Sequence, residues 1–234
     1  MSKAVVIMSG GQDSTICLHW AMSFYKDVMA VSFDYGQTHN IELLSAREIC
    51  EMNNIPHEII TVKDVLRSTS PLTDKAQPLE TYDNYEQMDE IIGDRVELTF
   101  VPMRNAMFLT IGANYALSKN CRTLVTGVCQ EDNANYPDCR AEFIASQTAT
   151  INQALGIQDF KIETPLMMLS KKQSVLLAQT LKGCMESLAF SHTCYAGVFP
   201  PCGKCHSCVL RAEGFAQAGV KDPLIERIEQ YNNG

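Results

Sequence analysis

The sequence predicts an α/β protein with a parallel, doubly wound sheet and a small C-terminal appendage. Short β-branched apolar runs alternate with segments whose apolar residues recur at helical spacing. This alternation is typical of parallel sheets that are covered by helices on both faces. The chain has 234 residues and is 46% hydrophobic, which is enough to bury one substantial core. A cysteine-dense segment follows the last alternating unit and indicates a separate, smaller unit.

The apolar runs and the periodic segments place the elements in order along the chain. The expected strands are Ala4–Met8, Val28–Phe33, Glu58–Val62, Thr123–Thr126 and Phe160–Glu163. The expected helices are Thr15–Phe24, Ile41–Met52, Asn105–Lys119, Glu142–Leu155, Lys171–Leu181, Ser207–Ala218 and Pro223–Tyr231. Ser170 is an N-cap candidate for the helix that follows it. Ligands of such sheets bind beyond the carboxyl ends of the strands.

The segment 64–96 interrupts this pattern, because its polar residues and prolines show little periodicity. We expect a long loop there, which is either a functional lid or an insertion without a role. The C-terminal portion, from about Ser187 onward, has too few apolar residues for a core of its own. We therefore expect a main domain over residues 1–186 and a metal-stabilised segment over residues 187–234.

Charge and cysteine usage restrict the partners. The formal net charge of −8 disfavours free nucleic acid, which is usually bound through clustered Lys and Arg. Gly10 and Gly11 cut the first apolar run far short of a signal peptide or a membrane span. We expect a cytoplasmic protein without a membrane partner. Its ten cysteines then indicate thiols and metal ligands rather than a disulfide framework.

Four of these cysteines, Cys194, Cys202, Cys205 and Cys208, lie within fifteen residues. Two overlapping C-x-x-C pairs share Cys205, and four thiolates satisfy tetrahedral zinc without leaving an open position. We expect a structural zinc site whose binding energy folds the segment. A redox motif or four unrelated thiols are the alternatives. His206 is a possible competing ligand, but its position between two cysteines is expected to turn it outward.

The stretch Ser9–Thr15 joins the first expected strand to a helix and has the character of a phosphate-binding loop. Backbone N–H groups and the helix dipole favour an anion there, and Gly10 and Gly11 allow its close approach. The loop lacks the lysine of a nucleoside triphosphatase and carries Asp13, a candidate magnesium ligand. It is better suited to a pyrophosphate than to γ-phosphoryl transfer. A glycine turn with an N-capping side chain is the alternative.

The loop matches the SGGxDS signature of the N-type ATP pyrophosphatases, or PP-loop enzymes. Further along, the chain resembles the 7-cyano-7-deazaguanine synthases in the same order over essentially its whole length. The motifs that carry this resemblance are Phe33–Gln37, Phe100–Asn105, Thr126–Val128, Tyr136–Arg140, Glu163–Met167 and the four-cysteine cluster. Two departures occur, since that family usually has glycine in place of Met103 and a Ser-Gly pair where this chain has Asn133-Ala134-Asn135.

The resemblance implies a PP-loop fold of the adenine nucleotide alpha hydrolase-like type and a ligase that forms carbon–nitrogen bonds. It implies that 7-carboxy-7-deazaguanine and ammonia are converted to the nitrile through adenylated acid and amide intermediates, as in queuosine and 7-deazapurine biosynthesis. ATP and Mg²⁺ would serve the reaction, zinc would be structural, and the protein would be a homodimer.

The physical requirements of the reaction that the resemblance implies suggest roles for individual residues. Asp13 and Arg104 would be catalytic, with Arg104 stabilising phosphate or carboxylate charge; a surface arginine near a helix start is the alternative. Nucleotide contacts would come from the loop, from the turn after it and from the end of the second strand, where Asp34 is otherwise a turn residue. These residues are Met8, Ser9, Gly10, Gly11, Gln12, Asp13, Ser14, Thr15, Ile16, Cys17, Leu18, Phe33 and Asp34.

The substrate contacts are expected downstream of the fourth strand. A carboxylate, Asp132 or Asp138, would accept from N1–H and the exocyclic amine of the base. Tyr136 or Phe100 would stack on the base, and Arg140 would pair with its carboxylate. Asp138 and Arg140 could instead pair with each other.

Three other functions fit part of the pattern. A tRNA-modifying sulfurtransferase also adenylates a base, but it would need a basic surface that this acidic chain does not offer. A zinc-stabilised binding module would sense nucleotide without turning it over. The two departures from the family pattern could also limit the enzyme to the amide product.

Overall fold

A computed structural model describes residues 2–38, 40–130 and 134–232. Within this part of the chain, one five-stranded sheet has the order β3-β2-β1-β4-β5, and every neighbouring pair is parallel. The strands are β1 (Lys3–Ile7), β2 (Asp27–Asp34), β3 (His57–Thr61), β4 (Thr123–Val125) and β5 (Lys161–Glu163). The predicted parallel α/β fold is confirmed.

Strand β1 lies at the centre of the sheet. Val5 pairs with Met29 on one side and with Leu124 on the other. Residues 4–6 are completely buried, which explains why β1 is a continuous apolar run rather than an alternating one. The chain leaves β1 towards β2 and leaves β4 towards β5, so the strand order reverses between β1 and β4. Such a switch point is where doubly wound sheets bind ligands.

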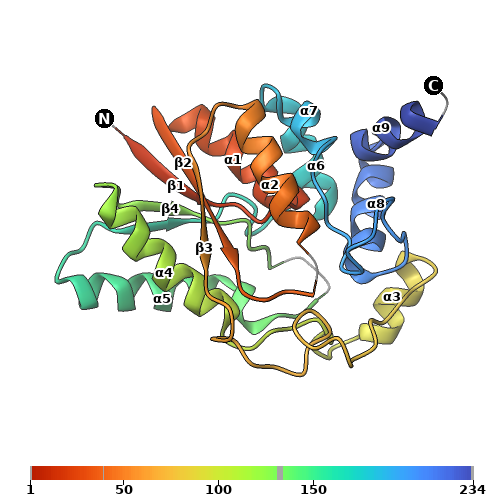
Figure 1. Cartoon of the computed structure of the whole chain (residues 1–234), viewed down its shortest axis with the longest axis horizontal. Helices are drawn as coiled ribbons and strands as arrows, with labels where there is room; N and C mark the ends of the chain where they lie inside the picture. The colour runs from red at the N-terminus through yellow and green to blue at the C-terminus, as the bar shows by residue number, and fades with distance from the viewer. Residues whose placement is uncertain (1, 39, 131–133, 233–234) are drawn as a thin grey trace.

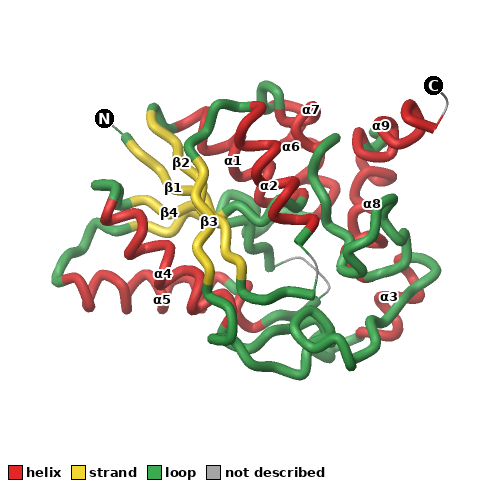
Figure 2. Tube along the Cα trace, viewed as in Figure 1, coloured by secondary structure: helices red, strands yellow, loops and turns green. Residues whose placement is uncertain are grey.

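Helices cover both faces of the sheet (Figures 1 and 2). One face carries α1 (Gln12–Phe24), α2 (Ile41–Met52), α6 (Lys171–Thr180) and α7 (Cys184–Leu188). The opposite face carries α4 (Arg104–Ser118) and α5 (Ala141–Leu155). Each layer has its own apolar core against the sheet. The predicted elements are present with ends shifted by a few residues; α1 begins at Gln12, because Gly11 is its N-cap.

The prediction of a loop throughout 64–96 is wrong for part of that segment. Helix α3 (Tyr85–Ile92) forms there, and the Asn84 side chain caps it by accepting from the Gln87 N–H at 2.8 Å. Met88 and Ile92 are buried and pack against helix α8 (His206–Ala218), which comes from the far end of the chain. A helix of two turns depends on such tertiary packing, because so short a helix is not stable by itself.

The C-terminal segment packs onto the sheet layer. Helix α8 lies against α6, and its Phe215 enters the same core as α1 and α2. Arg211 of α8 donates two hydrogen bonds to Asp222, at 2.6 and 2.8 Å, just before helix α9 (Pro223–Asn232). Both apolar burial against the main core and the cysteine cluster therefore hold this segment in place. The domain boundary at residue 186 stays a prediction. No described helix has both the length and the apolar character needed to span a bilayer.

Candidate functional site

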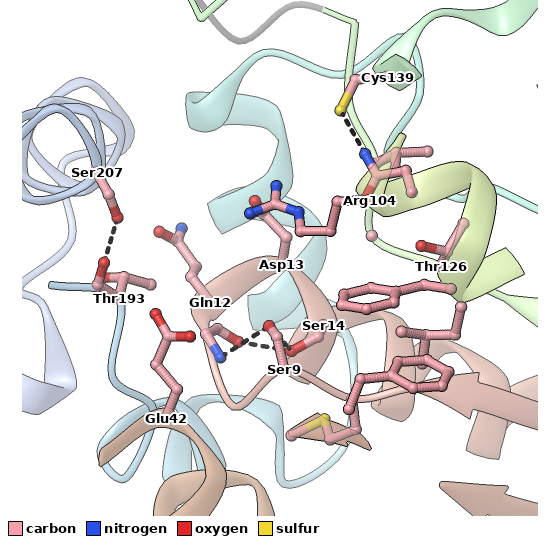
Figure 3. Close-up of a pocket in the computed structure, with 18 of the residues that line it drawn as sticks. Ser9, Gln12, Asp13, Ser14, Glu42, Arg104, Thr126, Cys139, Thr193 and Ser207 are labelled. Atoms are coloured by element: carbon pink, nitrogen blue, oxygen red, sulfur yellow. Dashed lines mark hydrogen bonds between the residues drawn. The ribbon is translucent and has the colours of Figure 1, made fainter. Parts of the chain in front are cut away.

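A cleft opens at the carboxyl ends of β1 and β4, at the switch point of the sheet. Its cavity measures about 260 Å³. The phosphate-loop candidate forms its floor, and side chains from α2, α4 and the C-terminal segment form its walls (Figure 3). The structure thus brings together segments that are far apart in the sequence.

The loop after β1 is rigidly shaped by its own hydroxyl groups. The Ser14 hydroxyl accepts from the Gly10 N–H at 3.2 Å and donates to the Gly11 carbonyl at 3.1 Å. The Thr15 hydroxyl donates to the same carbonyl at 2.8 Å. These bonds occupy hydroxyl groups that the sequence suggests as phosphate donors. The N–H groups of the loop and of the first turn of α1 remain as the main anion-binding feature.

Close packing explains the first glycine of the loop. Gly10 has φ +88°, and a Cβ there would lie 2.1 Å from the backbone oxygen of Glu42 in α2. The Gly10 carbonyl accepts from the His192 N–H at 2.8 Å. The C-terminal segment and α2 therefore fix the position of the loop from two sides.

The predicted nucleotide residues divide into two groups. Met8, Ser9, Gly11, Gln12, Asp13, Ser14 and Phe33 line the cleft. Thr15, Ile16, Cys17 and Leu18 are fully buried, and the last three belong to the core beneath α1. Asp34 lies outside the lining and pairs with Lys63 at 3.0 Å, as a strand-ending turn residue would. Gln12 is 2% exposed, and its Nε2 has no hydrogen-bond partner within the described residues.

The lysine that the loop lacks is supplied by a distant element. Lys171, the first residue of α6, places its Nζ 2.6 Å from Oδ2 of Asp13. Its side chain is only 10% exposed. Sequence reasoning missed this residue, although a cation at a helix N-terminus is unfavourable and signals an anionic partner. Asp13 remains an oxygen donor of the type that Mg²⁺ prefers.

Arg104 begins α4 and extends into the cleft, towards the same space as Asp13 (Figure 3). Burial alone would lower the pKa of its guanidinium, but the facing oxygens of Tyr35, Tyr136 and Tyr195 raise it above its usual range. The residue before it, Met103, has φ +66°, a conformation that glycine adopts without strain. This conformation accounts for the glycine that the resembling family has there, and Met103 itself is 68% exposed.

Tyr136 lines the cleft and also a neighbouring cavity of about 280 Å³. Its hydroxyl donates to Oε2 of Glu97 at 3.1 Å and contacts the Thr99 hydroxyl. Its ring lies 5.5 Å from the ring of Phe100, tilted by 32°. The two aromatic residues proposed for base stacking are thus adjacent, and Tyr136 is the one that lines the cleft.

Of the remaining substrate candidates, the structure describes Asp138 and Arg140. Asp138 is 8% exposed and accepts from Asn105, at 3.3 Å from the backbone N–H and at 3.1 Å from the side chain. Burial raises the pKa of Asp138. Arg140 lines the neighbouring cavity with Glu142, and within the described residues no ion pair joins it to Asp138. Asp132 lies outside the described residues, as does Asn133.

The four cysteines form the predicted cluster. Their sulfur atoms all lie within 4.8 Å of one another, and tetrahedral zinc needs separations of about 3.8 Å. Backbone N–H groups of Tyr195 and of Cys202 donate to sulfurs at 3.3 to 3.4 Å, which favours the thiolate forms. The donor set therefore fits zinc. His206 is buried rather than turned outward, and it is not part of the cluster.

The cluster also shapes one wall of the cleft. Tyr195 follows the first cysteine, and its N–H donates to the Cys205 sulfur at 3.4 Å. Thr193 and Ser207 are joined by a hydrogen bond of 2.5 Å from the Ser207 hydroxyl to the Thr193 carbonyl. All three line the cleft, and Figure 3 shows Thr193 and Ser207 on its wall. Sequence reasoning treated the cluster as structural only, because spacing alone does not show which residues its folding carries into the cleft.

Comparisons with known proteins show which family this chain is similar to. A family model described as Queuosine biosynthesis protein QueC matches residues 3–219. A relative from Laribacter hongkongensis, named 7-cyano-7-deazaguanine synthase, is 46% identical over 96% of this chain and 95% of its own. A relative of the same name from Chromobacterium violaceum is 43% identical over 99% of this chain and 97% of its own. The structure of NMN synthetase from Francisella tularensis is 15% identical, covers 98% of this chain and 83% of that chain, and has a TM-score of 0.47.

Proposed function

This chain belongs to the family described as Queuosine biosynthesis protein QueC, and on that premise we propose that it converts 7-carboxy-7-deazaguanine and ammonia to 7-cyano-7-deazaguanine with ATP as the activating co-substrate. It is an enzyme that forms a carbon–nitrogen bond. The observation that carries the proposal is the convergence of the Ser9–Thr15 loop, Arg104 and Tyr136 on one cleft.

A carboxylate is a poor electrophile, so its oxygen first attacks the α-phosphorus of ATP and displaces pyrophosphate. The leaving pyrophosphate gains charge, which the N–H groups at the start of α1 would stabilise. The Lys171 ammonium pairs with Asp13 at 2.6 Å and would hold this carboxylate in place beside the loop. Magnesium, when bound with Asp13 as a ligand, would neutralise further phosphate charge.

Ammonia then displaces AMP from the acyl adenylate and gives the amide. A second ATP activates the amide oxygen in the same way, and loss of AMP leaves the nitrile. Both rounds have the same leaving group, so one cleft serves both. Arg104 would stabilise the negative charge of the α-phosphate or of the substrate carboxylate.

The deazaguanine would stack on Tyr136, whose orientation Glu97 and Thr99 fix. Asp138, held by Asn105, would accept from the base edge. Asp132 and Arg140 stay predictions for the same recognition. Zinc at Cys194, Cys202, Cys205 and Cys208 would hold Tyr195 in the cleft wall.

The homodimer and the cytoplasmic location expected from the sequence are also part of this proposal. Light scattering tests whether the protein is a dimer in solution.

The proposal is tested by incubating the protein with MgATP, 7-carboxy-7-deazaguanine and ammonium, and by following the base by mass and AMP by chromatography. We expect loss of the acid, a nitrile product and AMP. Arg104→Ala should lower kcat/KM by about 10²- to 10³-fold, because it removes charge stabilisation. Arg122→Ala, which breaks an exposed ion pair with Asp159, is the matched control. Amide without nitrile would restrict the reaction to one round.

A further inference from the structure

We propose that the Glu42 carboxylate accepts the proton of ammonium in the cleft and so delivers ammonia to the adenylated substrate. This inference rests on the proposed function, because it assigns the proton acceptor of that reaction. It concerns a residue that the sequence does not single out.

Glu42 occupies the first turn of α2 and lines the cleft. The Gly10 loop packs directly on the Glu42 backbone, which fixes this turn against the phosphate-binding loop. In Figure 3 the Glu42 side chain extends into the cleft from below, on the same side as Gln12 and Thr193. The Glu42 carboxylate therefore shares a cavity of about 260 Å³ with the loop and with Arg104.

Among the described residues, Asp13 is the other carboxylate that lines the cleft, and it is paired with Lys171 at 2.6 Å. Asp138, which accepts from Asn105, and Glu97, which accepts from Thr99 and Tyr136 through Oε2, lie outside the lining. Among the residues that the structure describes, none donates a hydrogen bond to the Glu42 carboxylate. Glu42 thus retains the capacity to accept a proton from a small cation in the cleft.

The surroundings of Glu42 adjust its proton affinity to this task. Burial raises the pKa of Glu42 to about 7, with the Arg104 guanidinium acting to lower it and the Cys194 thiol to raise it. The Tyr35 and Tyr195 hydroxyls face it from the loop after β2 and from the C-terminal segment. A general base is most effective when its pKa lies near the working pH. A solvent-exposed glutamate would be a much weaker base.

The chemistry requires such a group. Ammonium has no lone pair, so one N–H proton must pass to Glu42 before the nitrogen can attack the carbonyl carbon of the acyl adenylate. The carbon–nitrogen bond then forms, and the bond between that carbon and the bridging oxygen breaks, so that AMP leaves with the bonding electrons. A second proton leaves the nitrogen for water. One ammonium and one acyl adenylate give one amide, one AMP and two protons.

Glu42→Gln tests the assignment, because the amide cannot accept the proton but fits the same space. Pyrophosphate–ATP exchange in the presence of 7-carboxy-7-deazaguanine and without ammonium measures adenylation alone. We expect this exchange to be retained in Glu42→Gln, whereas amide formation with ammonium at neutral pH falls by about 10²- to 10⁴-fold. The defect should shrink as the pH approaches the pKa of ammonium, since free ammonia then needs no base. Glu48→Gln, an exposed substitution on the same helix, should behave as wild type.

Two results would overturn the inference alone. Unchanged amide formation in Glu42→Gln would show that the carboxylate is not the proton acceptor. Loss of the exchange in Glu42→Gln would place Glu42 in nucleotide or magnesium binding instead. Absence of exchange in the wild-type protein would contradict the proposed function, and this inference with it.

Discussion

The substitution Gly10→Ala tests the packing of the loop against α2. The new Cβ would lie 2.1 Å from the backbone oxygen of Glu42 and 2.8 Å from the backbone nitrogen of Ala46. Both atoms belong to the helix backbone, so no side-chain rotation relieves the overlap. The positive φ costs an alanine about 1–2 kcal/mol of stability, and overpacking adds about 1–3 kcal/mol. Alanine also restricts the unfolded chain more than glycine does, which offsets about 0.4–1 kcal/mol of that loss. We expect a total loss of about 3 kcal/mol.

Urea unfolding at constant m-value measures this loss. Gly219→Ala is the matched control, because Gly219 has φ +69° and its Cβ would meet no atom within 4 Å. The control carries the conformational cost alone and should lose at most about 1.6 kcal/mol. Equal losses in the two variants would refute the packing argument.

Three further predictions concern other parts of the molecule. Met103→Gly should raise the unfolding free energy by about 0.5–1 kcal/mol, since it removes a strained φ at an exposed position; a loss of stability would contradict this. Cys205→Ser should lower bound zinc below about one ion per chain, measured by metal analysis, whereas Cys121→Ser outside the cluster should not. Burial lowers the pKa of His19 in the folded protein, so the imidazole binds a proton more readily in the unfolded chain. The neutral His19 therefore does not lower stability above about pH 6.5, whereas acidification below that pH should reduce the free energy of unfolding. Stability measured against pH should therefore fall less steeply in His19→Gln; equal slopes would contradict the assignment.

The sequence predicted those elements whose signals lie within the element itself, and it missed those that depend on contacts with residues far away in the chain. The strands around β1 are apolar on both faces, so their local composition was sufficient to identify them. Helix α3 was not identified, because Met88 and Ile92 are stabilised by α8, more than a hundred residues away. Its local signals, the capping pair Asn84 and Gln87 and the helical spacing of Tyr85, Met88 and Ile92, cover too few residues to distinguish a helix from a loop.

The same distinction applies to the site. The cysteine cluster and the loop after β1 are local in sequence, and the spacing of their residues indicated their chemistry. The contact between Lys171 and Asp13 joins residues 158 positions apart, so the place of Lys171 at a helix start indicates an anionic partner without identifying it as Asp13. Glu42 reads as an ordinary first-turn glutamate in the sequence, and only the packing of Gly10 on α2 places it in the cleft.

The central claim is that one cleft adenylates a 7-deazaguanine carboxylate and exchanges the AMP for ammonia. It is tested most directly by supplying 7-carboxy-7-deazaguanine, labelled with ¹⁸O in its carboxylate, together with MgATP and ammonium. We expect each AMP released to carry one labelled oxygen, because the substrate oxygen attacks the α-phosphorus and leaves with AMP. AMP without the label, or the absence of AMP alongside unchanged acid, would contradict it.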